Sequence, residues 1–160
     1  MLKNVSGDIL LSGAKAIAHG IAPNDHFASG LALALRERYP ALAKDFRHWF
    51  HEAHPKVGEL WAWASPEGVR VYNLLTQEPA PGEKALPGKA KLEHVNHALR
   101  ALRHTIEEEK IASLAVPRIA TGHGGLDWAD VEPLIRQHLG TLNIPVYIYS
   151  SYVKGEKAAE

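Results

Sequence analysis

The chain has 160 residues, of which 46% are apolar, and this is typical of one globular domain with a single core. Its 18 basic and 18 acidic residues cancel, which excludes a polycationic grip on nucleic acid or a basic membrane patch as the main activity, although local basic patches remain possible. Cysteine is absent, so disulfides, thiolate metal sites and a cysteine nucleophile are excluded.

The sequence shows neither the pattern of a signal peptide nor that of a membrane-spanning segment. Asp8 interrupts the N-terminal segment before the apolar run of a signal peptide can form. No stretch approaches the roughly 20 apolar residues needed to span a bilayer. We therefore expect a cytoplasmic, monomeric protein without a membrane partner.

Two strands and two helices are predicted in the first third of the chain. Residues 2–5 are expected to form a short first strand, and residues 14–19 are short and apolar, which indicates a buried strand. The small and polar loop 20–30 then leads into a helix over 31–36, and a proline separates it from a second helix over 41–54.

A hairpin and the longest helix follow. Residues 57–64 place two tryptophans on one face at a period of two, and residues 69–75 form the second strand of the hairpin. The proline-rich and glycine-rich segment 76–89 is expected to be an open loop. In the helix over 90–110, the apolar residues advance by three or four positions, which predicts one stripe packed against a sheet: Leu92, Val95, Leu99, Leu102 and Ile106.

The last third repeats the alternation of strand and helix. A buried strand over 114–116 precedes a glycine loop, and Asp127 is expected to cap the next helix. Residues 146–149 predict the final strand. We expect one domain over residues 1–152 and a frayed tail over 153–160. Helices that alternate with buried strands predict an α/β sandwich around a mixed sheet.

Two loops of small residues each enter a helix. Ala28-Ser29-Gly30 precedes Leu31, and the segment 121–126 precedes Asp127. Free backbone N–H groups beside a positive helix end are a common way to hold phosphate. Two such loops therefore suggest that a pyrophosphate is bound from both sides. The alternative is that both loops are tight turns without a ligand. Neither loop fits the P-loop or the Rossmann glycine spacing.

Histidine spacing on two helices raises the question of a metal site. Three histidines recur every three residues at His48, His51 and His54, and His94 and His97 form a second pair. Such spacing can bring two imidazoles to one metal, but no third ligand falls in register. We expect exposed histidines and neither a metal nor a cofactor.

Several short motifs recur in a fixed order along the chain. They are Gly7-Asp8-Ile9-Leu10, Ala18-His19, Ser29-Gly30-Leu31-Ala32, Val116-Pro117-Arg118-Ile119 and Gly122-His123-Gly124-Gly125-Leu126-Asp127-Trp128. Their order resembles the macrodomain family, and within it the branch of the terminal ADP-ribose protein glycohydrolase and the DNA ADP-ribosyl glycohydrolase antitoxins. The similarity extends from about Leu2 to Tyr149, and it implies a three-layer α/β/α sandwich with a central mixed sheet of about six strands.

The resemblance implies a site for ADP-ribose. Asp8 would accept a hydrogen bond from the adenine amino group with the Ile9 backbone beside it, unless it is only a turn aspartate. Tyr149 would flank the adenine, unless it is a core residue of an edge strand. The two loops would supply backbone donors to the diphosphate from Ala28, Ser29, Gly30 and Leu31 on one side and Thr121, Gly122, His123 and Gly124 on the other.

The reaction of such a site is attack at the anomeric carbon of the distal ribose, which needs a positioned water, an acid or base and nearby negative charge. Relatives carry a lysine that can attack the opened sugar, and Gln77 stands in its place. Some relatives also carry an acid where this chain has Gly124. The groups that remain for catalysis are His19, Asp25, His26 and His123, and Lys84 or Lys89 could replace the lysine.

Three functions are compatible with these residues. The first is a hydrolase that removes ADP-ribose from a protein, a nucleic acid or a phosphate. The second is a non-catalytic module that binds free or attached ADP-ribose, which the loss of the lysine at Gln77 favours. The third is a generic α/β scaffold for another nucleotide. Retention of His19 favours the hydrolase.

Overall fold

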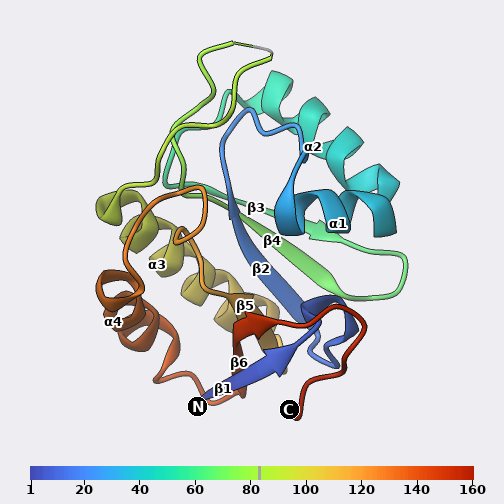
Figure 1. Ribbon diagram of the computed structural model, residues 1–160, viewed down its shortest axis with the longest axis vertical. Helices are drawn as coiled ribbons and strands as arrows, with labels where there is room; N and C mark the ends of the chain where they lie inside the picture. Colours follow the sequence, from blue (N-terminus) through green and yellow to red (C-terminus); the bar gives the residue numbers. More distant parts are fainter. Residues whose placement is uncertain (83) are drawn as a thin grey trace.

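The computed structural model describes residues 1–82 and 84–160, which form one mixed sheet between two pairs of helices (Figure 1). The strands of the sheet are β1 (Leu2–Gly7), β2 (Ala16–Ile21), β3 (Leu60–Ala64), β4 (Arg70–Leu75), β5 (Leu114–Pro117) and β6 (Val146–Tyr152). The helices are α1 (Gly30–Arg38), α2 (Pro40–Ala53), α3 (Leu92–Glu109) and α4 (Trp128–Leu139), and a short 3-10 turn η1 (Ile9–Leu11) follows β1.

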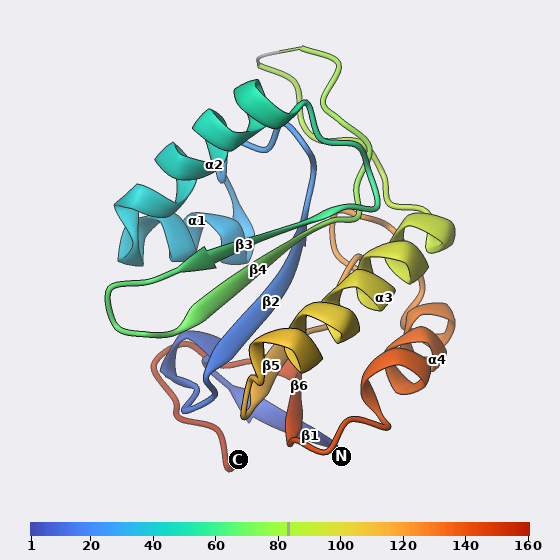
Figure 2. The same cartoon turned by 180° about the vertical axis from the view of Figure 1, so that it is seen from behind.

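The strand order is β1-β6-β5-β2-β4-β3. All neighbouring pairs are parallel except β3 and β4, which form the predicted antiparallel hairpin. Figures 1 and 2 show α1 and α2 on one face of the sheet and α3 and α4 on the other. The predicted three-layer α/β/α sandwich is confirmed.

The two faces of β2 explain why the sheet has helices on both sides. Ala16 and Ala18 lie in the core under α3 and α4, where small side chains let the large residues of those helices approach. The alternate residue Ile21 packs instead with the aromatic core under α1 and α2. A strand that is buried on both faces reads as a continuous apolar run, which is the pattern seen in the sequence.

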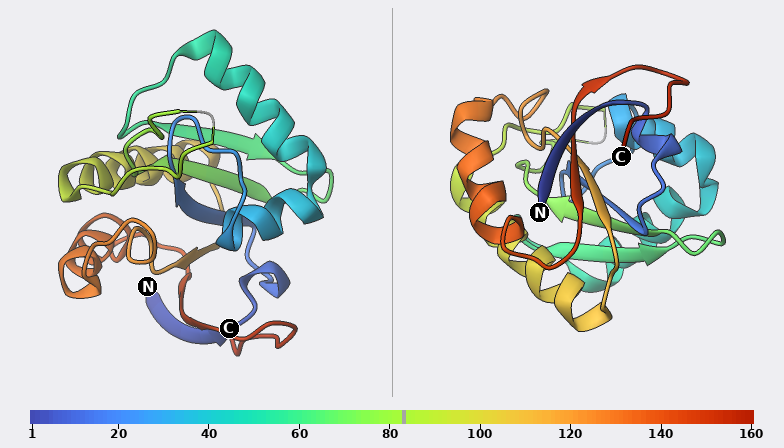
Figure 3. Two further views of the ribbon diagram at one scale, coloured as in Figure 1. Left: turned by 45° about the horizontal axis from the view of Figure 1, so that its top comes forward. Right: turned by 90° about the horizontal axis from the view of Figure 1, so that it is seen from below.

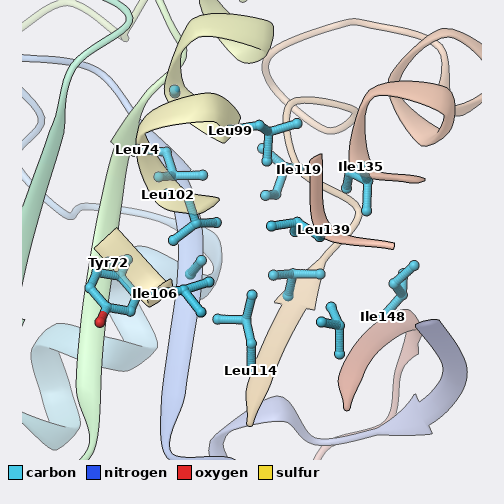
Figure 4. Packing of buried hydrophobic residues seen from close by; sticks show 14 of the residues in the cluster. Tyr72, Leu74, Leu99, Leu102, Ile106, Leu114, Ile119, Ile135, Leu139 and Ile148 are labelled. Atoms are coloured by element: carbon cyan, nitrogen blue, oxygen red, sulfur yellow. The ribbon is translucent and has the colours of Figure 1, made fainter. Parts of the chain in front are cut away.

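The stripe of α3 packs as predicted, with one exception. Leu99, Leu102 and Ile106 are buried against β4 and β5 (Figure 4), as is Val95. Leu92 begins the helix and remains exposed, because the first turn extends past the edge of the core. Asp127 does precede α4, but its side chain makes no capping hydrogen bond.

The C-terminal tail is not frayed, so that expectation is wrong. After β6 the chain turns back along β1 and η1 (Figure 3), and the Asp8 N–H donates to the Glu156 carbonyl at 2.7 Å. The Glu160 carboxylate accepts hydrogen bonds from the Gly13 N–H at 3.0 Å and from the Tyr149 hydroxyl at 2.6 Å. Ala158, within the tail, is buried in a cluster with Val5 and Ile9. These bonds join the tail to the domain.

Within residues 1–82 and 84–160, no helix combines the length and the apolar character needed to cross a bilayer.

Candidate functional site

The functional residues predicted from the sequence gather at one edge of the sheet. Because β2, β4 and β5 run parallel, the loops that follow them lie at the same end of the molecule (Figure 1). These loops surround a cleft of about 440 Å³, within the size range of small-molecule sites. The predicted residues that line the cleft are His19, Asp25, His26, Ala28, Ser29, Gly30, Leu31, Gly122, His123 and Gly124.

The loop after β2 is shaped by Asp25. One carboxylate oxygen accepts a hydrogen bond from the Phe27 N–H at 2.8 Å, and the other accepts one from the Ala22 N–H at 3.2 Å. This turn holds Phe27 at φ 56° with its ring fully buried. The Asp25 carboxylate therefore orders the loop, which restricts its use as a catalytic base.

The first turn of α1 completes that side of the cleft. The first bond of the helix runs from the Leu33 N–H to the Ser29 carbonyl at 3.2 Å, so the preceding N–H groups have no acceptor within the helix. Gly30 adopts φ 59°, a backbone conformation that favours glycine, and a Cβ there would meet only open space. This turn is a suitable anion site because its N–H groups and the helix dipole act together.

The loop after β5 forms the opposite side by tight backbone packing. The Leu126 N–H donates to the Ala120 carbonyl at 3.0 Å, and Ala120 adopts φ 65°. A Cβ on Gly124 would lie 2.6 Å from that same carbonyl oxygen, so the backbone leaves no space for a side chain. An acidic side chain therefore does not fit at position 124 in this loop conformation.

His19 lies at the floor of the cleft and is only 2% exposed. Its Nε2 is 2.7 Å from Asn73 Oδ1, while the Asn73 amide nitrogen donates to the carbonyls of Trp61 and Val71. This network fixes the amide orientation, so His19 Nε2 carries the proton and donates. Nδ1 is then the unprotonated ring nitrogen, and among the described residues the only side-chain hydrogen bond of His19 is the one from Nε2.

Burial keeps His19 neutral. It lowers the pKa of the imidazole below its ordinary value, although the hydrogen bond to Asn73 and the charge of Asp25 act in the opposite direction. A neutral imidazole with an unprotonated Nδ1 can accept a proton near neutral pH.

Gln77 is a structural residue of the next loop. Its side chain is nearly buried and donates from Nε2 to the Gly88 carbonyl at 3.2 Å, and its backbone forms a bridge with Ala90. The amide therefore ties together the two ends of the segment 78–89. It cannot act as a nucleophile toward the sugar.

The other candidate side chains differ in whether they already form hydrogen bonds within the protein. His123 donates from Nε2 to the Pro87 carbonyl at 2.6 Å, and Lys89 donates to the His123 carbonyl at 3.1 Å. Both side chains thus hold the two loops together. Lys84 lines the cleft, which leaves it the better placed of the two lysines. His26 lines the cleft as well and is exposed at its rim.

An apolar pocket of about 410 Å³ adjoins the cleft, with which it shares Gly30, Leu31 and Pro117. Ile9 and Tyr149, which the resemblance would place beside the adenine, line it. The sequence analysis missed Tyr152, whose ring is 59% exposed at the mouth of the pocket, because the final strand was expected to end at Tyr149. A flat apolar pocket beside an anion site suits an aromatic base.

Asp8 and Thr121 do not line these cavities. Asp8 is buried, and its carboxylate accepts hydrogen bonds from the Leu10 N–H at 3.0 Å and the Gly155 N–H at 2.9 Å, which is the turn role weighed above. The Thr121 hydroxyl donates to the Arg118 carbonyl at 2.7 Å. Both residues shape the backbone beside the site.

Of the histidines on the helices, one contacts a backbone carbonyl and two others are exposed. His97 Nδ1 lies 2.8 Å from the Gly58 carbonyl, whereas His48 and His51 are exposed on α2. Among the described residues, no group of three or more histidine or acidic side chains is arranged to hold a metal ion.

The packing of the second loop gives a testable prediction. Gly124→Ala should lower the free energy of unfolding by about 1–3 kcal/mol, since its Cβ would overlap the Ala120 carbonyl. Gly122→Ala is the matched control, because nothing lies within 4 Å of a Cβ at that position. Urea denaturation of both variants measures the difference, and equal stabilities would contradict the packing described.

Known proteins resemble this chain along most of its length. A DNA ADP-ribosyl glycohydrolase of Mycobacterium tuberculosis is 27% identical over 132 residues, which are 82% of this chain but only 37% of that protein. The solved macrodomain of Mycobacterium tuberculosis DarG superposes with a TM-score of 0.81 at 25% identity, covering 93% of this chain and 97% of that chain.

A third solved structure, Thermosipho africanus DarTG in complex with ADP-ribose, has a TM-score of 0.78 at 20% identity and covers 98% of this chain and 42% of that chain. The family model described as "Macro domain" matches residues 28–135, which is more than half of the sequence. The chain belongs to the macro domain family.

Proposed function

We propose that the chain binds ADP-ribose across the cleft and hydrolyses the bond between its distal ribose and an acceptor. The observation that carries this proposal is the pair of backbone loops, Ala28–Leu31 and 122–124, on opposite sides of one cleft. The relative from Mycobacterium tuberculosis is named as a DNA ADP-ribosyl glycohydrolase, and this supports the same ligand and class of reaction.

The three parts of ADP-ribose match three consecutive environments. The adenine fits the apolar pocket, between Ile9 and the exposed ring of Tyr152. The diphosphate lies between the two loops, where backbone N–H groups bind it without a cationic side chain. The distal ribose then reaches the end of the cleft formed by His19 and Gln77.

In this arrangement His19 is the general base. Its Nδ1 accepts a proton from water while the water oxygen forms a bond to the anomeric carbon. The bond from that carbon to the acceptor breaks, and the acceptor leaves with the electron pair and takes up a proton, for which His26, exposed at the rim, is the candidate donor. The negative charge of Asp25 stabilises the positive charge that develops on the sugar.

A non-catalytic reader is the second candidate function. Gln77 is fixed to the Gly88 carbonyl and Gly124 cannot bear a side chain, so neither position supplies the reactive group found in relatives. A reader would bind ADP-ribose in the same way and turn over no substrate. The cytoplasmic location and the monomeric state expected from the sequence stay predictions.

Binding is tested by calorimetric titration with ADP-ribose, ADP and AMP. We expect a dissociation constant for ADP-ribose in the micromolar range, about −8 kcal/mol, and much weaker binding of AMP, which lacks the diphosphate. Absence of binding at millimolar ADP-ribose would mean that both loops are turns without a ligand.

Catalysis is tested through His19. His19→Ala should abolish release of ADP-ribose from a modified substrate and change ADP-ribose affinity by no more than about 1–2 kcal/mol. His97→Ala, a histidine on α3 that contacts the Gly58 carbonyl, is the control and should leave turnover unchanged. Binding without any turnover by the wild-type chain would establish the reader instead.

The pH dependence of kcat/KM adds a second readout of His19. Because burial lowers the pKa of this imidazole, the base stays deprotonated below the ordinary value of about 6.5. Activity should therefore persist through pH 6.5 and fall only as the pH drops through the lowered pKa. An acidic limb centred above 6.5 would assign the base to another group.

A further inference from the structure

Arg118 is a cation of the cleft that the proposed function leaves unused. It directly follows β5, whose last residue, Pro117, lines both the cleft and the apolar pocket. Arg118 itself lines the cleft. Gly30 and Leu31, at the start of α1, also line both cavities. Arg118 therefore lies next to the junction of the two cavities, on the side of the cleft.

The backbone around Arg118 is fixed by two hydrogen bonds. The Ile119 N–H donates to the Pro117 carbonyl at 2.9 Å, which makes a three-residue turn centred on Arg118. The Thr121 hydroxyl donates to the Arg118 carbonyl at 2.7 Å. The point from which this exposed side chain extends is thus set by the end of the strand and by the second loop.

The guanidinium of Arg118 is held in place but not neutralised. Its Cζ lies 5.1 Å from the ring centroid of Trp128, the half-buried first residue of α4, so the cation stacks on the face of the indole. Within residues 1–82 and 84–160, the guanidinium forms no ion pair. Stacking uses the face of the guanidinium and leaves the N–H groups in its plane available to a ligand.

The sugar between the adenine and the diphosphate, which we call the adenosine ribose, has to cross this junction. With the adenine in the apolar pocket and the diphosphate between the two loops, that sugar passes the residues that line both cavities, Gly30, Leu31 and Pro117. The backbone N–H groups of the loops already bind the diphosphate, and the 2′ and 3′ hydroxyl groups of the adenosine ribose are neutral. The charge of Arg118 therefore has no matching anion on this sugar in unmodified ADP-ribose.

We propose that Arg118, held by Trp128, is a subsite for a phosphate monoester on the 2′ or 3′ hydroxyl of the adenosine ribose, so that the chain binds such a phosphorylated ADP-ribose more tightly than ADP-ribose; this rests on the proposed function. An arginine near the ribose is a known means of accommodating a 2′-phosphate in dinucleotide-binding proteins. The guanidinium can donate two parallel hydrogen bonds to phosphate oxygens, and the opposite charges strengthen both bonds.

Calorimetric titration with four ligands tests the subsite. The probes are ADP-ribose, its 2′-phosphate, its 3′-phosphate and its 2′-O-methyl derivative, which adds bulk without charge. We expect one of the two phosphates to bind at least about 10-fold tighter than ADP-ribose, because hydrogen bonds between charged groups are stronger than those to a neutral hydroxyl. This gain should shrink as salt is added, since the ion pair is exposed. The 2′-O-methyl derivative should show no gain, and the tighter phosphate identifies the hydroxyl that the subsite recognises.

Variants assign the gain to the guanidinium. Arg118→Ala should remove most of it and change the affinity for ADP-ribose itself by less than about 3-fold, which also shows that the variant is folded. Arg118→Lys keeps the charge but not the planar fork, so it should keep only part of the gain. Arg100→Ala is the matched control, because Arg100 is an exposed arginine of α3 that lines neither cavity, and it should behave like the wild-type chain.

The outcomes separate the two proposals. Absence of binding for all four ligands would overturn both the proposed function and the phosphate subsite. Binding of ADP-ribose without a gain from either phosphate, or a gain that survives Arg118→Ala, would overturn the subsite alone. An equal loss of affinity for ADP, ADP-ribose and both phosphates in Arg118→Ala would assign Arg118 to the diphosphate, and this result would also overturn the subsite.

Discussion

The parallel alignment of β1, β6, β5, β2 and β4 is the constraint on which the site depends. Parallel strands place all their carboxyl ends at one edge, and only there can loops that are distant in sequence face each other across a cleft. The core supports this arrangement from both faces, since small residues of β2 let α3 and α4 pack closely on one side and aromatic residues cover the other.

Backbone conformation, more than side-chain charge, defines the cleft. Phe27 and Ala120 both adopt positive φ angles, and each lies in one of the two loops that face the cleft. Asp25 stabilises the first of these turns, and the hydrogen bond from the Leu126 N–H to the Ala120 carbonyl stabilises the second. A site made of backbone N–H groups binds an anion without a large positive charge, which is consistent with a chain whose formal charge is zero.

Much of this fold was predictable, because strand and helix periods are local signals. The two loops and His19 were also identified, since small residues before a helix and a titratable group after a buried strand can be seen in the sequence alone. The role of the tail could not be predicted. Its attachment depends on backbone bonds from Asp8 and Gly155 and on Glu160, and none of these contacts has a sequence pattern.

Side-chain roles in the site were harder to predict for a related reason. Gln77 was seen only as a missing lysine, whereas its amide holds the ends of a loop together. Asp25 was a candidate base, but its oxygens are occupied by the turn that it forms.

The central claim is that both loops bind one diphosphate. The chemical shifts of the backbone amides test this claim most directly. Nitrogen–proton correlation NMR spectra of isotope-labelled protein should be recorded with and without ADP-ribose. We expect large shifts at the amides of Gly30, Leu31, Gly122 and Gly124 together, with smaller shifts at α3. Shifts confined to one loop, or centred outside both, would contradict the account.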